Sequence, residues 1–82
     1  MQVQFYGIDD WSRPVFKVVD KKLFIGSVDH LVDYGDTEEE IFNYFKDNLN
    51  ELVYFGTTFN CEPDGSKINA ELELLFNEQK KV

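Results

Sequence analysis

The sequence of 82 residues lacks several features that would place it in a familiar structural class. It has one cysteine, which excludes an internal disulfide and with it a disulfide-stapled secreted fold. Its apolar runs, of which residues 52–55 are typical, are far shorter than the roughly 20 residues that a membrane-spanning helix needs. The first residues contain neither a basic nor an apolar stretch, so we predict no signal peptide and a cytoplasmic location.

Basic residues and glycine-rich motifs are scarce too. Eight Lys and Arg stand against sixteen Asp and Glu, which gives a formal net charge of −8. Because recognition of nucleic-acid phosphates depends on Lys and Arg, we expect no direct binding to nucleic acid. The five glycines are scattered and match neither the Walker motif nor GxGxxG, which excludes nucleotide binding through a glycine-rich loop. We expect no cofactor and no membrane partner.

Residues that could carry catalysis are few. The one Cys–His pair that the sequence offers is Cys61 with His30, and the acids around Cys61 disfavour the thiolate that such chemistry requires. A carboxylate pair for glycoside hydrolysis needs a cleft long enough to hold a sugar, which a domain of this length rarely forms. We therefore predict that the protein is not an enzyme and has no catalytic residues.

Aromatic residues, by contrast, are abundant. Eight Phe, four Tyr and one Trp suffice to build a hydrophobic core, so the composition is that of a folded chain. Residues 3–8 are rich in strand formers, and the turn residues of 9–14 end that strand. The β-branched and aromatic residues that follow predict a hairpin in which 14–19 pairs with 22–28.

The clearest predicted element is a helix that begins after Thr37. Thr37 and Glu40 have the spacing of a capping box, and acidic residues fill the first turn, where the helix dipole favours them. An apolar stripe follows at helical spacing: Ile41, Phe42, Phe45, Leu49 and Leu52. The sequence leaves the end of the helix open. Either it runs to Phe55, with Gly56 as the cap, or it stops near Asn50 and 52–59 forms a strand. In both cases we expect a strand at 57–59.

The last segment, residues 67–79, is ambiguous between strand and helix. Apolar and polar residues alternate from Ile68 to Asn77, which is typical of a half-buried strand. Ile68, Leu72 and Leu75 also fit one face of a helix, and Ala, Glu and Leu favour helices. We favour the strand, because a mostly β domain needs a closing strand.

These elements predict a single α+β domain over residues 1–82. It consists of a small, mainly antiparallel sheet of four to five strands with one amphipathic helix packed on it. The phase of each strand stays open. The predicted core is Phe5, Val15, Val18, Leu23, Ile25, Ile41, Phe42, Phe45, Leu49, Leu72 and Leu74.

Residues 60–71 partly match the calcium loop of an EF-hand, which suggests an alternative function as a divalent-cation module. Oxygen ligands would stand at the first, third, fifth and twelfth positions of the loop: Asn60, Glu62, Asp64 and Glu71. Gly65 matches the glycine of the sixth position, whereas Pro63 and Lys67 depart from the pattern. The competing and favoured interpretation is a β-turn at 63–65, which suits the Pro-x-Gly spacing.

The acidic residues are concentrated in the middle of the chain. Residues 23–66 contain ten acids and one base, whereas both ends are nearly neutral. Six of these acids fall within residues 29–40: Asp29, Asp33, Asp36, Glu38, Glu39 and Glu40. One interpretation is a solvated loop followed by an ordinary acidic helix start. The other is an electrostatic patch that binds a protein with a basic surface.

Aromatic residues near the acids are candidate contacts, because Tyr and Trp anchor many protein interfaces. We rank Tyr34 and Tyr44 above Trp11, since Tyr44 lies off the apolar stripe of the predicted helix. The sequence therefore predicts a small acidic interaction protein that contacts its partner through these two tyrosines and the six acids. A homodimer is also open, because so short a chain has a small core.

Two stretches carry a resemblance to a known group. Residues 5–17, FYGIDDWSRPVFK, resemble the opening of small uncharacterised proteins from Gram-positive phages and conjugative elements. In that opening, an aromatic-Gly strand precedes Asp-x-Trp-x-Arg-Pro-Val-Tyr-Lys. Residues 59–65 are similar to the Phe-Asp-Gly-Glu-Pro-Asp that often closes those proteins, with Asn60-Cys61 in place of Asp-Gly. The resemblance implies an origin in a mobile element of a low-GC Gram-positive bacterium, and no known activity.

Overall fold

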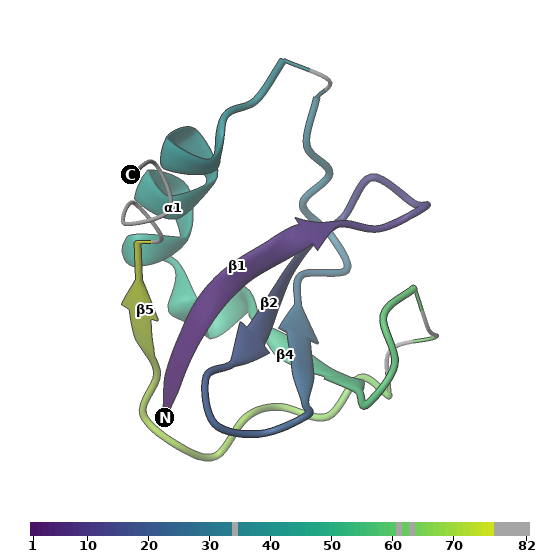
Figure 1. Ribbon diagram of the computed structural model, residues 1–82, viewed down its shortest axis with the longest axis vertical. Coiled ribbons are helices and arrows are strands. Elements are labelled where there is room, and N and C mark those ends of the chain that lie inside the picture. The colour runs from purple at the N-terminus through teal and green to yellow at the C-terminus, as the bar shows by residue number, and fades with distance from the viewer. Residues whose placement is uncertain (34, 61, 63, 77–82) are drawn as a thin grey trace.

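A single sheet carries one helix in the computed structural model, which describes residues 1–33, 35–60, 62 and 64–76 (Figure 1). The strands are β1 (Gln2–Ile8), β2 (Pro14–Val18), β3 (Phe24–Gly26), β4 (Val53–Gly56) and β5 (Glu73–Leu75). The helix α1 (Glu38–Lys46) and the short 3-10 helix η1 (Leu49–Glu51) lie between β3 and β4 in the chain. The predicted α+β fold, one helix on a mainly antiparallel sheet, is confirmed.

The five strands stand in the order β4-β3-β2-β1-β5. The neighbouring pairs from β4 to β1 are antiparallel, and β5 is parallel to β1, with Val3 opposite Leu74. The predicted hairpin is confirmed, because β2 and β3 pair with Phe16 opposite Ile25. Its two strands are shorter than the predicted ranges.

The strand interpretation of the last segment is confirmed for residues 73–75 and is wrong for 68–72. Lys67 forms a bridge with Val53 beside β4, and the chain then crosses the end of the sheet to reach the opposite edge (Figure 1). There the amide of Glu73 donates to the carbonyl oxygen of Met1 at 2.9 Å. A parallel pair needs such a crossover, so the residues that cross are not available for pairing. Residues 77–79 of the predicted strand lie outside the described residues.

The capping box at the start of α1 is confirmed. The Glu40 amide donates to Thr37 Oγ1 at 3.1 Å, and the Thr37 amide donates to Glu40 Oε1 at 2.9 Å. The helix ends at Lys46, so the longer of the two predicted helices, running to Phe55, is wrong. The alternative of an early end followed by a strand agrees with the structure, in which that strand is β4.

The strand predicted at 57–59 is wrong. β4 ends at Gly56, whose φ of 110° is a conformation that glycine adopts without steric cost. The chain then turns and packs the Phe59 ring against two rings of the sheet. Its centroid lies 5.2 Å from that of Tyr6 and 6.1 Å from that of Phe24. Packing of one aromatic side chain therefore takes precedence over the strand propensity of the Thr-Thr-Phe sequence.

Buried residues form two clusters, one on each face of the sheet, because the adjacent residues Val15 and Phe16 of β2 belong to different clusters. The larger cluster consists of Val3, Phe16, Val18, Ile25, Val32, Ile41, Phe45 and Leu52. The smaller one consists of Val15, Phe24, Val53 and Phe55, with the Phe59 ring packed against it.

The predicted core is confirmed in part. The buried members are Val15, Val18, Ile25, Ile41 and Phe45, and the half-buried ones are Phe5, Leu23, Phe42, Leu49, Leu72 and Leu74. The prediction omitted other buried residues, namely Val3, Phe16, Phe24, Val32, Leu52, Val53 and Phe55. For Phe16 and Phe24 the reason is that the inner strands β2 and β3 carry buried residues on both faces, so alternation does not mark a single inward side.

Candidate functional site

The segment between β3 and α1 contains three of the six predicted acids, the other three form the first turn of α1, and the segment is attached to the rest of the molecule at several points. Ser27 is buried, and its Oγ accepts a hydrogen bond from the His30 amide at 3.1 Å. The His30 ring stacks on the Tyr44 ring of α1 with centroids 4.1 Å apart. Val32 is buried in the larger cluster, and its amide donates to the Ser12 carbonyl at 2.9 Å. Residues 27–32 of the acidic segment are therefore anchored to the sheet side of the molecule and to α1.

The six acids of the loop and of the first turn of α1 do not all have the same role. Asp36 is half-buried and its Oδ2 accepts from the Asp33 amide at 3.0 Å, while Glu40 completes the capping box. Glu38 is half-buried as well. Asp29, Asp33 and Glu39 have exposed side chains. These three are the acids best placed to meet a partner, because the other carboxylates stabilise the loop or the helix start or are partly covered.

Of the two predicted tyrosine contacts, only Tyr44 is among the residues that the structure describes. Tyr34 lies outside the described residues. Tyr44 is half-buried, and its hydroxyl donates to Glu51 Oε2 of η1 at 2.9 Å. This hydrogen bond, with burial and the Glu51 charge adding to it, raises the pKa of Tyr44 above its ordinary value of 10.0. Tyr44 therefore supports the loop through His30 and remains in part accessible.

Trp11, which we ranked below the tyrosines, has an exposed fraction of 53%. It stands on the turn between β1 and β2, and its ring lies 4.7 Å from the guanidinium carbon of Arg13. The Ser12 carbonyl of this turn accepts the bond from Val32, so the turn and the acidic loop are neighbours. The two segments and the end of β1 carry four exposed apolar side chains: Ile8, Trp11, Val28 and Leu31.

The turn is held by a buried ion pair that the sequence analysis did not identify. Arg13 donates from Nε to Asp9 Oδ2 at 2.7 Å, and Asp9 Oδ1 accepts from the amides of Trp11 and Arg13. Asp9 and Arg13 are 5% and 8% exposed. The Asp-x-Trp-x-Arg pattern behind the family resemblance thus has a structural role here. The signal available in the sequence was an acid and a base four residues apart, across a turn that ends in proline.

The proposed calcium ligands are not brought together. Asn60 Oδ1 accepts from the Asp10 amide at 2.8 Å, and Asp64 Oδ1 accepts from the Ser66 amide at 2.7 Å. The Glu71 carbonyl accepts from the amino group of Met1 at 2.7 Å. Across the described ranges, no three side chains of His, Cys, Asp or Glu gather as a metal site would require. The turn predicted at 63–65 includes Pro63, which lies outside the described residues, as does Cys61 of the Cys–His pair.

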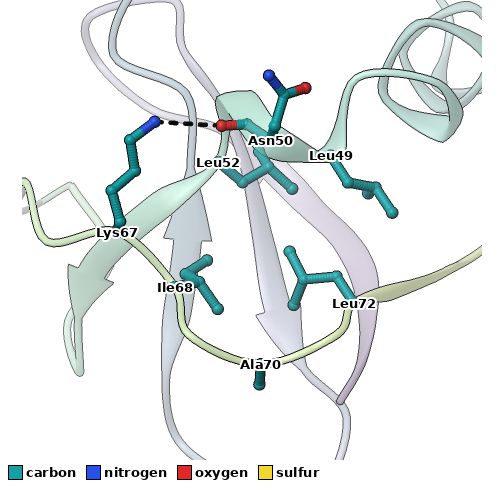
Figure 2. A pocket seen from close by; sticks show the side chains of 7 residues that line it. All are labelled: Leu49, Asn50, Leu52, Lys67, Ile68, Ala70 and Leu72. Carbon is teal, nitrogen blue, oxygen red and sulfur yellow. Dashed lines mark hydrogen bonds between the residues drawn. The ribbon is translucent and has the colours of Figure 1, made fainter.

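Two cavities lie next to η1. Figure 2 shows the first, which has a volume of about 260 Å³ and a mostly apolar lining from Leu49, Leu52, Ile68, Ala70 and Leu72. At its rim the Lys67 ammonium donates to the Asn50 carbonyl at 3.4 Å. The second cavity, of about 580 Å³, shares Asn50 and Lys67 with the first. The rest of its lining is more polar: Ser27, Val28, Asp29, His30, Tyr44, Glu51 and Val53.

Comparison of the chain with protein-family models, with curated proteins and with solved structures finds no match. Of the helices in the described part of the chain, none has the length and apolar character needed to cross a bilayer. The surface and the cavities of this structure are therefore what bears on its function.

Proposed function

We propose that the protein is a non-enzymatic accessory protein that binds a basic surface of another protein through residues 29–40, with Trp11 beside them. The observation that supports this most is that residues 27–33, anchored through Ser27, His30 and Val32, present exposed acids and exposed apolar side chains together. Leu31 is 60% exposed and follows the exposed Asp29 by two residues. An exposed leucine between acids, next to an exposed tryptophan, is typical of a contact surface rather than of a solvated loop.

The attachment of the loop favours binding on thermodynamic grounds. A segment that is already held by the Ser27, His30 and Val32 contacts loses little conformational freedom when a partner binds. The charge acts over a longer range. A net charge of −8 with its surplus in residues 23–66 attracts a basic partner before contact and disfavours acidic ones.

The direct test is a double charge reversal, Asp33→Lys with Glu39→Lys, in a chain used as bait for affinity purification from its host. Both side chains are exposed, and neither forms the capping box, so the fold should be kept. We expect capture of the principal basic partner to fall about tenfold, because exposed interface charges govern association. Raising the salt concentration should weaken capture by the unchanged protein in the same direction.

A matched control keeps the overall charge change and moves it elsewhere. The pair Asp20→Lys and Glu62→Lys alters net charge equally at exposed positions outside the proposed surface. Leu31→Ser tests the apolar part and should weaken capture at every salt concentration. Equal capture by the unchanged protein and by the Asp33/Glu39 variant would contradict the proposal. An equal loss of capture in the Asp20/Glu62 control would show a general charge effect in place of a site.

The mobile-element origin implied by the resemblance stays a prediction.

A further inference from the structure

The larger of the two cavities beside η1 combines features that suit a positively charged group. Its lining contains two carboxylates, from Asp29 of the loop and Glu51 of η1, in a space of about 580 Å³. That volume lies within the range of small-ligand sites, which is about 300–1,000 Å³. Ser27 and Val53, both buried, contribute to the wall.

One wall of this cavity is formed by stacked aromatic rings. His30 and Tyr44 lie nearly parallel, with an angle of 12° between their planes, and both rings meet the Phe45 ring edge-on. Because the stack is packed on a buried phenylalanine, its orientation is fixed. The electron-rich face of an aromatic ring attracts cations, and a planar guanidinium can lie flat on it.

The Glu51 carboxylate is also held in place. Its Oε2 accepts the hydrogen bond from the Tyr44 hydroxyl at 2.9 Å, which ties the carboxylate to the aromatic wall. A carboxylate fixed beside an aromatic face is a favourable arrangement for a guanidinium, which donates in its plane and stacks through its face.

Lys67 is the one positive side chain among the lining residues and works against a cationic ligand. Its ammonium is directed to the Asn50 carbonyl at the rim that the two cavities share (Figure 2). Among the Asp, Glu, Lys and Arg side chains of the lining, two carboxylates stand against one ammonium, so carboxylates are in excess.

We propose that this cavity binds the guanidinium of an arginine side chain, with Asp29 and Glu51 as its charge partners and the His30–Tyr44 stack as its platform. That the arginine comes from the basic partner protein rests on the function proposed above. The choice of a guanidinium as the ligand does not rest on that function, because it follows from the lining of the cavity alone. The site would then select arginine-containing partner surfaces over those that carry lysine, whose ammonium has no flat face to stack.

The test uses the full chain and small probes followed by NMR of the backbone amides. The probes are acetyl-arginine amide, the lysine equivalent, and acetyl-citrulline amide, which has nearly the shape of arginine without its charge. We expect arginine to shift the amides of Asp29, His30, Tyr44 and Glu51 with millimolar affinity, lysine to bind more weakly, and citrulline to cause no shift. Equal shifts with citrulline, or no shift with arginine at tens of millimolar, would overturn the proposal.

Substitutions of the lining residues should change the affinity for arginine in opposite directions, according to the charge that each one removes. Glu51→Gln keeps an oxygen to accept from the Tyr44 hydroxyl and removes the charge, and Asp29→Asn changes an exposed side chain. Each should weaken arginine binding about threefold, while Lys67→Met should strengthen it by about the same factor. Asp20→Asn, at an exposed position outside the lining, should leave binding unchanged. If the lining variants and Asp20→Asn behave alike, the cavity is not the site.

The two proposals fail separately. Arginine binding that is weakened in Glu51→Gln, combined with partner capture that is insensitive to the Asp33/Glu39 reversal, would support the cavity site and contradict the proposed surface. Arginine binding that is unchanged in Glu51→Gln, combined with partner capture that falls in the Asp33/Glu39 variant, would support the surface and contradict the cavity site.

Discussion

Asp9 and Arg13 show how much of this structure depends on single side chains. The carboxylate accepts two backbone amides of its own turn and the guanidinium of Arg13, whose carbon lies 4.7 Å from the Trp11 and Phe55 rings alike. A charged pair out of water is stabilising only when its hydrogen bonds are satisfied. Here the pair fixes the turn that carries Trp11 and meets the acidic loop. From the sequence we identified Asp9 as a turn residue, but nothing in the sequence shows that its carboxylate and the Arg13 side chain would be buried.

A double-mutant cycle on this pair should show strong coupling. Asp9→Asn keeps an oxygen for the turn amides and removes the charge, so it should lower the free energy of unfolding by about 3 kcal/mol. Arg13→Met should lower the free energy of unfolding by a similar amount. The double variant should lose clearly less than the sum of the two, because neither charge is then buried. Denaturant unfolding of the four proteins measures this, and additive losses would contradict a stabilising pair.

Among the elements, the sheet is where prediction from sequence was most successful and also where it failed. Local patterns identified the hairpin of β2 and β3, the capped start of α1, and the strand residues of β1. The patterns did not predict that β4 would end at Gly56 or that β5 would be short and parallel. Both outcomes depend on contacts between distant parts of the chain: Phe59 on Tyr6, and Glu73 on Met1.

Gly26 of β3 should be intolerant of a side chain. A Cβ at this position would lie 2.8 Å from the Phe55 ring and 2.9 Å from the Pro14 carbonyl oxygen, and a backbone atom cannot easily move away. We expect Gly26→Ala to lower the free energy of unfolding by about 1–3 kcal/mol.

Gly7 of β1 is the matched control for that substitution. A Cβ there would meet the Phe59 ring at 3.6 Å, which is ordinary contact. Gly7→Ala should therefore change stability by a few tenths of a kcal/mol, or about 0.5 at most. Thermal and denaturant unfolding measure the stability of both variants. An equal loss of stability in the two would contradict the idea that close packing around Gly26 excludes a side chain there.

At the scale of the whole molecule, the charge and the packing are separated in space. The sheet is covered on both faces by aromatic and aliphatic residues, while the acidic surplus lies in the loop and helix start that follow β3. In Figure 1 this segment extends away from the strands, with α1 beside β5. Val32 joins this segment to the larger cluster, whereas Asp29, Leu31 and Asp33 are exposed and can be substituted at little cost to the fold.

Stability should be uneven across this arrangement. β2 lies between two strands and most of its residues are buried, whereas β5 has three residues at the end of the sheet and none of them is buried. We expect native-state hydrogen exchange to show the slowest amides in β2 and exchange at least about tenfold faster in β5, because the edge opens locally. Equal protection of β5 and β2 would indicate that the closing strand is part of the most stable unit.

The sequence by itself determined the class of the fold, the start of the helix, the hairpin and the position of the acidic surplus. Each of these follows from residues that are close in the chain, through strand propensity, capping and charge counting. The tertiary structure decided the rest. It placed Trp11 beside the acidic loop, buried the Asp9–Arg13 pair, stacked His30 on Tyr44 and brought Asp29 and Glu51 to one cavity. The physical reason is that these arrangements depend on segments far apart in sequence. Even the local Asp9–Arg13 pair is covered by a distant residue, since the Phe55 ring lies 4.7 Å from the Arg13 guanidinium carbon.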